Sequence, residues 1–109
     1  MANVYDNPIV LDTDITSYRT AASKSNGGKV EKLMLVVGSG GAATAGSVTI
    51  KAPTANGGFE LYPPILVGTQ AANTTILNDN ISRQVLTWAD FAVTGLTATG
   101  TKLYIWLVQ

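Results

Sequence analysis

Few residues in this chain are able to do chemistry, because its 109 residues include no histidine and no cysteine. Serine–histidine and cysteine–histidine nucleophilic pairs are therefore excluded, as are disulfides and thiolate metal sites. The lysines leave a serine–lysine arrangement open, but they lie in the polar contexts that are typical of solvated side chains. We expect no catalytic residue and no enzymatic activity.

Carboxylates are the next candidates, either as a glycosidase pair or as metal ligands. Asp12 and Asp14 are two positions apart, so they share a face if this segment is a strand. Asp79 lies between Asn78 and Asn80, an oxygen-rich sequence that is compatible with Ca²⁺. Neither group has the glycine-anchored loop with a terminal bidentate glutamate. The sequence therefore favours side chains that bond their own backbone in turns over a metal site.

A glycine-rich run, residues 38–43, follows the apolar run that ends at Val37 and matches the glycine spacing of a dinucleotide-binding turn. Glu60 lies about where an acidic ribose ligand would be. That mechanism needs a helix after the glycines, because the pyrophosphate binds at the helix N-terminus. Residues 44–50 instead return to an alternating strand pattern. The run therefore predicts a flexible hairpin loop, and we expect no cofactor.

The charge of the chain is low and balanced, with seven basic and seven acidic side chains and a formal net charge of zero. Charged residues make up 13% of the chain, about half the usual share. Binding to nucleic acid through phosphates needs a basic excess, so we expect no nucleic-acid partner. A neutral, sparsely charged surface also keeps a free monomer poorly soluble, which indicates that other subunits cover part of the surface.

No segment of the sequence is typical of export or of membrane insertion. The first residues lack a basic region followed by an apolar run, so we expect no secretory signal and synthesis in the cytoplasm. The longest apolar run, residues 33–37, is far too short to cross a bilayer, and we expect no membrane partner.

Short strands separated by dense turn signals dominate the pattern, in what we predict to be a single domain spanning residues 1–109. We expect one short helix near residues 14–22, and an exposed loop or a loosely paired edge over residues 68–82. Spacing of this kind is typical of an antiparallel sandwich or barrel. The strands are expected at residues 8–11, 33–37, 47–51, 59–65, 84–88 and 103–108.

Two strands are apolar on both faces, which identifies a candidate interface. Residues 33–37 form a continuous apolar run, so we expect both of its faces to be covered. On the last strand, Tyr104 and Trp106 share one face, and the leucines and isoleucine at 103, 105 and 107 share the other. One face must be core, and the other is covered by the second sheet or by another subunit. The candidate interface residues are Tyr104, Trp106, Pro63 and Pro64.

Three stretches carry a resemblance to a known class of protein. They are residues 7–14 (NPIVLDTD), residues 30–51 with their glycine-rich turn and VTI strand, and residues 95–107 with GTKLYI. In their order and spacing they resemble small virion proteins of tailed bacteriophages, in particular head decoration (cement) proteins. The resemblance implies a jelly-roll-like β-sandwich that binds the outside of the capsid shell and stabilises the phage head.

The same resemblance implies the partners and the location. They are the major capsid protein, a second copy in a homodimer or another homo-oligomer, and the virion, after synthesis in the host cytoplasm. Two alternatives stay open. A tail or fibre component has the same fold signature, and a carbohydrate-binding β-sandwich module needs aromatics and carboxylates clustered on one exposed face.

Overall fold

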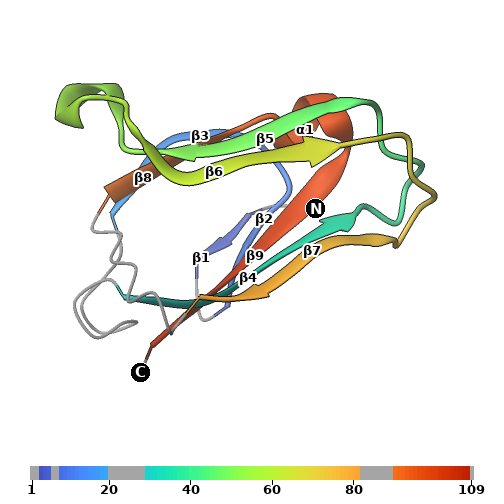
Figure 1. The fold of residues 1–109 in the computed structure, drawn as a ribbon, viewed down its shortest axis with the longest axis horizontal. Coiled ribbons are helices and arrows are strands. Elements are labelled where there is room, and N and C mark those ends of the chain that lie inside the picture. Colours follow the sequence, from blue (N-terminus) through green and yellow to red (C-terminus); the bar gives the residue numbers. More distant parts are fainter. Residues whose placement is uncertain (1–2, 6–7, 20–28, 82–89, 109) are drawn as a thin grey trace.

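Two antiparallel sheets pack face to face in the computed structural model of the chain, which describes residues 3–5, 8–19, 29–81 and 90–108. The two layers lie one above the other in Figure 1, with their strands spanning the long dimension of the molecule. The fold is therefore the all-β sandwich that the alternation of short strands and turns predicts.

The five-stranded sheet contains both strands that the sequence marks as apolar on two faces. In spatial order it consists of β1 (Val4–Tyr5), β2 (Ile9–Leu11), β9 (Thr101–Leu107), β4 (Val30–Val37) and β7 (Thr75–Asn80). The β9 strand thus lies at the centre, between β2 and β4, and β7 forms one edge.

The four-stranded sheet is the second layer. In spatial order it consists of β3 (Ile15–Arg19), β8 (Asp90–Thr94), β5 (Gly46–Lys51) and β6 (Glu60–Val67). Two short helices belong to its connections: the 3₁₀ helix η1 (Thr54–Asn56) joins β5 to β6, and α1 (Leu96–Thr99) follows β8. Neither of these described helices is long and apolar enough to cross a membrane.

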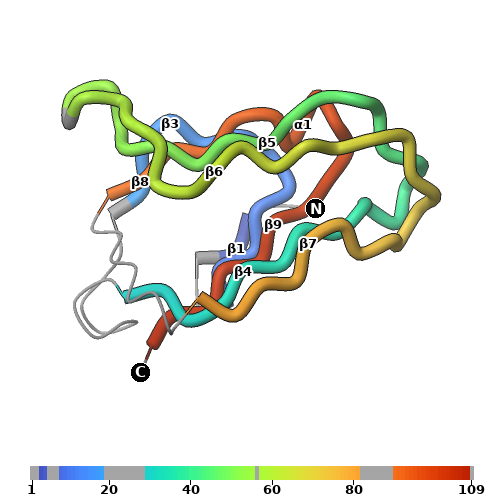
Figure 2. The backbone as a smooth tube through the Cα atoms, in the orientation of Figure 1, coloured from blue at the N-terminus to red at the C-terminus, as the bar shows by residue number. Residues whose placement is uncertain are grey.

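The strands pair in a nested order that can be followed in Figure 2. The β5 strand pairs with β6, β4 with β7, β3 with β8, and β2 with β9, all antiparallel. Strands β2 to β9 are therefore one long hairpin, folded at the β5–β6 connection and rolled into two four-stranded layers. Two further pairings, β4 with β9 and β5 with β8, complete the layers. This is the jelly-roll arrangement of eight strands.

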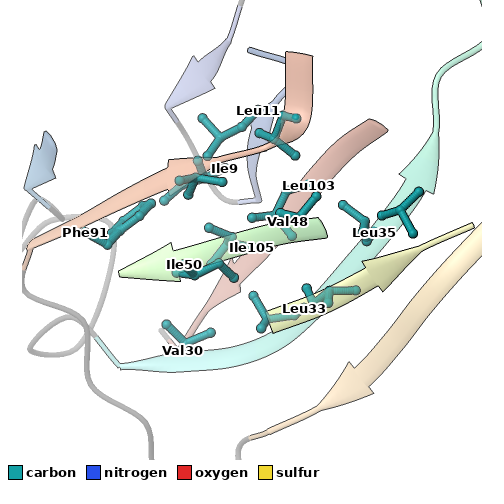
Figure 3. Close-up of a cluster of buried hydrophobic side chains, with 14 of the residues drawn as sticks. Ile9, Leu11, Val30, Leu33, Leu35, Val48, Ile50, Phe91, Leu103 and Ile105 are labelled. Carbon is teal, nitrogen blue, oxygen red and sulfur yellow. The ribbon is translucent and has the colours of Figure 1, made fainter. Parts of the chain in front are cut away.

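The core lies between the sheets and is made mostly of alternate residues of β2, β4, β5, β6, β8 and β9 (Figure 3). On the β9 and β5 strands the buried residues are those that the alternation predicts, because successive side chains point to opposite faces. The largest fully buried side chains are Phe91, Ile9, Leu11, Leu33, Leu35, Ile50, Ile81, Leu96, Leu103, Ile105 and Leu107.

The helix that we expect near residues 14–22 is wrong, because the described part of that segment is strand β3. Its first two residues, Ile15 and Thr16, are β-branched, and β8 supplies a pairing partner more than seventy residues later in the chain. Asp14 does cap a helix, but a distant one. Its Oδ1 accepts hydrogen bonds from the backbone N–H groups of Leu96 and Thr97, at 2.8 and 3.2 Å.

Residues 68–82 contain an edge strand, β7, but it is not loosely paired: its ladder with β4 is regular from Lys32 opposite Asn80 to Leu35 opposite Leu77, with one register shift before Val36. The strand expected at 84–88 lies outside the described residues.

Gly95 makes the sharp turn from β8 into α1 and has φ 97°, in the left-handed region that favours glycine. A Cβ atom at this position would overlap the backbone carbonyl of Ser47 on the neighbouring β5 strand. The side chain of Thr99 returns to the turn and donates a hydrogen bond of 2.6 Å to the Gly95 carbonyl. The junction therefore needs glycine both for its conformation and for the close approach of β5.

We predict that Gly95→Ala lowers the free energy of unfolding by about 3 kcal/mol, because a left-handed residue with a Cβ is strained and must also displace β5. Gly41→Ala is the matched control, since a Cβ there meets no atom within 4 Å. Urea unfolding followed by tryptophan fluorescence measures both variants. Equal stabilities of the two variants would contradict this account of the turn.

Candidate functional site

The outer surface of the five-stranded sheet carries three rows of cross-strand neighbours. The first runs through Val4, Val10, Tyr104, Met34 and Asn78 across all five strands. The second contains Trp106, Lys32 and Asn80, and the third Lys102, Val36 and Thr75. Because antiparallel partners project from the same side of a sheet, these side chains form one continuous surface. We call the part formed by Val4, Val10, Met34, Val36, Tyr104, Trp106, Lys32 and Lys102 the aromatic face.

Tyr104 and Trp106 are at the centre of the aromatic face, on the central strand β9. Their rings are nearly parallel, with an interplanar angle of 19° and centroids 5.8 Å apart. The Nζ atom of Lys32 lies 5.1 Å from the centre of the Trp106 ring, within the range of a cation–π contact. The two rings and the lysine therefore contact one another on the outer side of the paired strands β4 and β9.

Burial decides between the two environments that the sequence leaves open for Tyr104 and Trp106. Both side chains are half-buried, while Leu103, Ile105 and Leu107 on the other face of β9 are buried in the core. The second sheet therefore packs on the leucine and isoleucine side and does not cover the two aromatics. On β4, Met34 and Val36 are also half-buried, so the expectation that both faces of this strand are covered is wrong for a single chain.

Pro63 and Pro64 lie elsewhere, in strand β6 at the edge of the four-stranded sheet, and both are exposed. A proline has no N–H group, so two prolines interrupt the row of donors that an edge strand offers to another chain. Their position fits protection of the edge against strand pairing. The structure does not bring them together with Tyr104 and Trp106, which belong to the other sheet.

Two exposed apolar residues near these prolines are absent from the sequence-based set. Leu66 on β6 is 79% exposed, and Phe59, at the start of the strand expected over residues 59–65, is 60% exposed. The signal for Leu66 lies in the alternation of β6, because Ile65 and Val67 on either side of it are buried.

The carboxylates that we considered as a glycosidase pair or as metal ligands lie in different parts of the fold. Asp12 and Asp14 lie in the connection between β2 and β3 rather than on a strand, and Asp14 is engaged at α1. Asp79 lies within β7, so the expected turn is wrong as well. Within the described residues, no three acidic side chains gather closely enough to hold a metal ion.

Asp79 instead connects the two sheets through their edge strands β6 and β7. The Tyr62 hydroxyl of β6 donates a hydrogen bond of 2.6 Å to Oδ2 of Asp79 on β7. Burial of Tyr62, followed by the hydrogen bond to Asp79 and the charge of that carboxylate, raises the pKa of the phenol to about 12. The pair links edge strands that share no backbone ladder.

The glycine-rich run after Val37 is a crossover between the sheets, and the hairpin that we expect there is wrong, because β4 and β5 belong to different layers. Backbone hydrogen bonds hold the loop to α1 and to the β6–β7 connection: Thr44 donates to Thr99 at 3.0 Å, and Ala43 donates to Gln70 at 2.8 Å. Strand β5 follows the loop directly, without the helix that a pyrophosphate site needs.

Comparisons of the chain with models of protein families, with curated proteins and with solved structures give no match. The aromatic face is therefore the candidate site on its geometry alone.

The Tyr62–Asp79 bond predicts a loss of stability at alkaline pH. Below about pH 10 the phenol is protonated in both the folded and the unfolded chain, and its contribution is fully present. Between about pH 10 and 12 the unfolded chain loses this proton first, so the free energy of unfolding falls. We expect Tyr62→Phe to lose about 1–2 kcal/mol at neutral pH and to show a shallower decline in this window.

Urea unfolding at a series of pH values from 8 to 12 measures this effect against the other groups that titrate there. Tyr104→Phe is the control, because it removes a hydroxyl from the aromatic face and leaves the Asp79 bond intact. Parallel pH profiles for the wild type and Tyr62→Phe would show that the bond contributes nothing.

Proposed function

We propose that the protein is a structural virion protein that decorates the outside of a tailed-bacteriophage head and stabilises the shell by binding the major capsid protein. The observation that carries this proposal is the aromatic face, an apolar surface on the outside of a jelly-roll sandwich. The resemblance of residues 7–14, 30–51 and 95–107 to head decoration proteins supplies the identity of the partner.

The composition of the aromatic face supports a protein partner. Tryptophan, tyrosine and methionine are enriched at protein interfaces, and tryptophan and tyrosine are among the residues that contribute most to affinity. Here all three types lie side by side, at Trp106, Tyr104 and Met34, and each is half-buried in the single chain. A docked subunit would remove the rest of their apolar surface from water.

The position of the aromatic face in the fold also favours tight binding. Its central residues come from β4 and β9, which pair with each other over nearly their whole length. Side chains on paired central strands are already ordered before a partner arrives, so less conformational entropy is lost on association. The aromatic face can thus bind the shell without first becoming ordered. A homodimer or another homo-oligomer would present several copies of this face at once and so bind more tightly.

A carbohydrate-binding module is the second candidate, favoured by the nearly parallel rings of Tyr104 and Trp106. Exposed aromatic rings can pack against the apolar face of a sugar, and the exposed Asn78 and Asn80 side chains lie on the same surface. Asp79 does not supply the carboxylate that we expect beside the rings, because it points to the other side of β7, where it meets Tyr62.

We predict that Trp106→Ala stays folded but weakens binding to capsid shells by about thirtyfold or more, which corresponds to about 2 kcal/mol. The fold survives because the ring lies outside the core. The measurement is co-sedimentation with shells of the parent phage that have been stripped of surface proteins. Circular dichroism confirms folding, and Leu66→Ala, which removes an exposed apolar side chain from the other sheet, should bind as the wild type does.

Three results would count against head decoration. Unchanged binding by Trp106→Ala would remove the aromatic face from the interface. Binding of the wild type to purified tails but not to shells would favour a tail or fibre component. Binding to soluble oligosaccharides that is lost in Trp106→Ala, without binding to shells, would favour the carbohydrate module.

A further inference from the structure

The outer edge of β7 is open in the part of the chain that the structure describes. This strand ends the five-stranded sheet, and β4 is the only described strand that pairs with it along a ladder. An edge strand presents a row of backbone N–H and C=O groups with which another strand can pair. The β6 edge lies on the same side of the sandwich, since the Tyr62–Asp79 hydrogen bond joins the two strands (Figure 1).

The other three described edges each carry a feature that discourages pairing. Strand β1 has only two residues, and β3 has a register shift between Ile15 and Tyr18. Strand β6 contains Pro63 and Pro64. Short edges, bulges and prolines are the devices by which natural sheets avoid association with other strands. Strand β7 has no proline and no lysine, and its ladder is regular over residues 77–80, so it is the edge left available for pairing.

The hydrogen-bond pattern shows which backbone groups of β7 face outward. The Ile81 N–H donates to the Glu31 carbonyl at 2.9 Å, so these two residues form a hydrogen-bonded pair. Hydrogen-bonded and non-hydrogen-bonded pairs alternate along an antiparallel ladder, and the backbone groups of the second kind point away from each other. Three positions further along the regular ladder, the pair of Asn78 and Met34 is of this second kind. The N–H and C=O groups of Asn78 therefore point away from β4, toward the open edge.

A second copy of the same chain meets the requirements of this edge. Pairing of identical strands about a twofold axis gives the same groups the same partners in both copies. Asp79 is the one charged side chain of β7, and its Oδ2 accepts the Tyr62 hydroxyl of its own chain on the inner side of the sheet. It therefore does not project into the path of an added strand. The formal net charge of the chain is zero, so two copies do not repel each other through their overall charge.

We propose that two copies of the chain form a dimer by antiparallel pairing of their β7 strands about a twofold axis at Leu77. Leu77 of one copy then lies opposite the partner subunit's Leu77. Asn78 lies opposite the partner subunit's Ile76, with its outward N–H and C=O groups in the new ladder. Leu77 is already partly buried against the core of its own chain, and the second leucine extends that apolar contact across the axis.

The charge of Asp79 selects this register among the symmetric ones. An axis at Asp79 would place two carboxylates directly opposite each other, and an axis at Asn78 would place them on a diagonal, about 7–8 Å apart. An axis at Leu77 instead places Asp79 opposite the partner subunit's Thr75, whose hydroxyl can donate a hydrogen bond to a carboxylate. The two like charges are then well separated.

The dimer joins two five-stranded sheets into one continuous sheet. Because antiparallel partners project from the same side of a sheet, the aromatic faces of both copies lie on one side of the dimer. A shell could therefore be bound through two aromatic faces at once, with a gain in overall affinity. Only this use of the dimer rests on the proposed role in head decoration; the pairing of β7 does not.

The first test is analytical ultracentrifugation over about 1 µM to 1 mM, a range that covers weak dimers. We expect the wild type to show a monomer–dimer equilibrium. Asn78→Pro removes a donor that points away from β4, so the fold is kept and dimerisation weakens by at least about tenfold. Asn78→Ala keeps this donor and should dimerise as the wild type does. Trp106→Ala should do the same, because the aromatic face is not the dimer contact.

A cysteine cross-link tests the register and does not depend on the proline variant. The chain has no cysteine, so a single introduced one has no other partner within its own chain. Leu77→Cys should form an intermolecular disulfide on mild oxidation, because opposite residues of a non-hydrogen-bonded pair have Cα atoms about 4.5 Å apart, within disulfide range. Thr75→Cys is the matched control on the same strand, and it should not cross-link. Gel electrophoresis without reductant measures both variants.

Several results would overturn the β7 dimer. They are a wild type that stays monomeric up to about 1 mM, a folded Asn78→Pro that dimerises as tightly as the wild type, and loss of the dimer in Trp106→Ala. If circular dichroism shows that Asn78→Pro does not fold, the cross-link decides, and equal cross-linking of Leu77→Cys and Thr75→Cys overturns the proposal. A dimer that does not bind shells would count against head decoration alone, and a monomer that binds shells would count against the dimer alone.

Discussion

The ladder between β4 and β9 is the interaction on which the other features of this molecule depend. It runs from Val30 opposite Leu107 to Val37 opposite Thr101, and it joins the middle of the chain to its last strand. Its register places Leu33 beside Ile105 on the core side, and Met34 beside Tyr104 on the outer side. A slip of one residue in either strand would exchange the two sides, turning leucines to solvent and aromatics into the core. The core and the aromatic face are thus two consequences of one register.

Much of the architecture could be predicted from the sequence, because strand alternation and turn residues are local signals. The inward positions of Val48 and Ile50, and the core face of the last strand, follow from a period of two. The β3 and β7 strands were harder to predict. Isolated from their partners, Ile15–Arg19 resembles a weakly capped helix and Thr75–Asn80 a polar loop. Their identity as strands depends on β8 and β4, which lie far away in the sequence, and no local pattern encodes that pairing.

The candidate site was predictable to a similar degree. Tyr104 and Trp106 stand out because they alternate with core residues, yet the sequence could not say which surface would cover them. The two prolines were predicted as interface residues beside the aromatics, but they lie on an edge strand of the other sheet, where they fit protection of that edge. A hollow on the outer surface of the four-stranded sheet carries no sequence signal, since its lining consists of common residues from three separate segments, 14–16, 51–58 and 92–94. The role of Asp14 was equally hidden, because it caps α1 across more than eighty residues.

The central position of β9 also bears on how the chain is made. This strand leaves the ribosome after the other described strands, yet it fills the gap between β2 and β4 in the five-stranded sheet. Until it arrives, neither neighbour has its main partner on that side, and the inner faces of Leu11 and Leu33 lack the side chains that cover them. The nascent chain must therefore hold a half-built sheet with two unpaired edges, a state that invites association with other nascent chains. A chain cut before Thr101 would keep β2 and β4 but lose the strand between them, and its exposed edges would make it prone to aggregate.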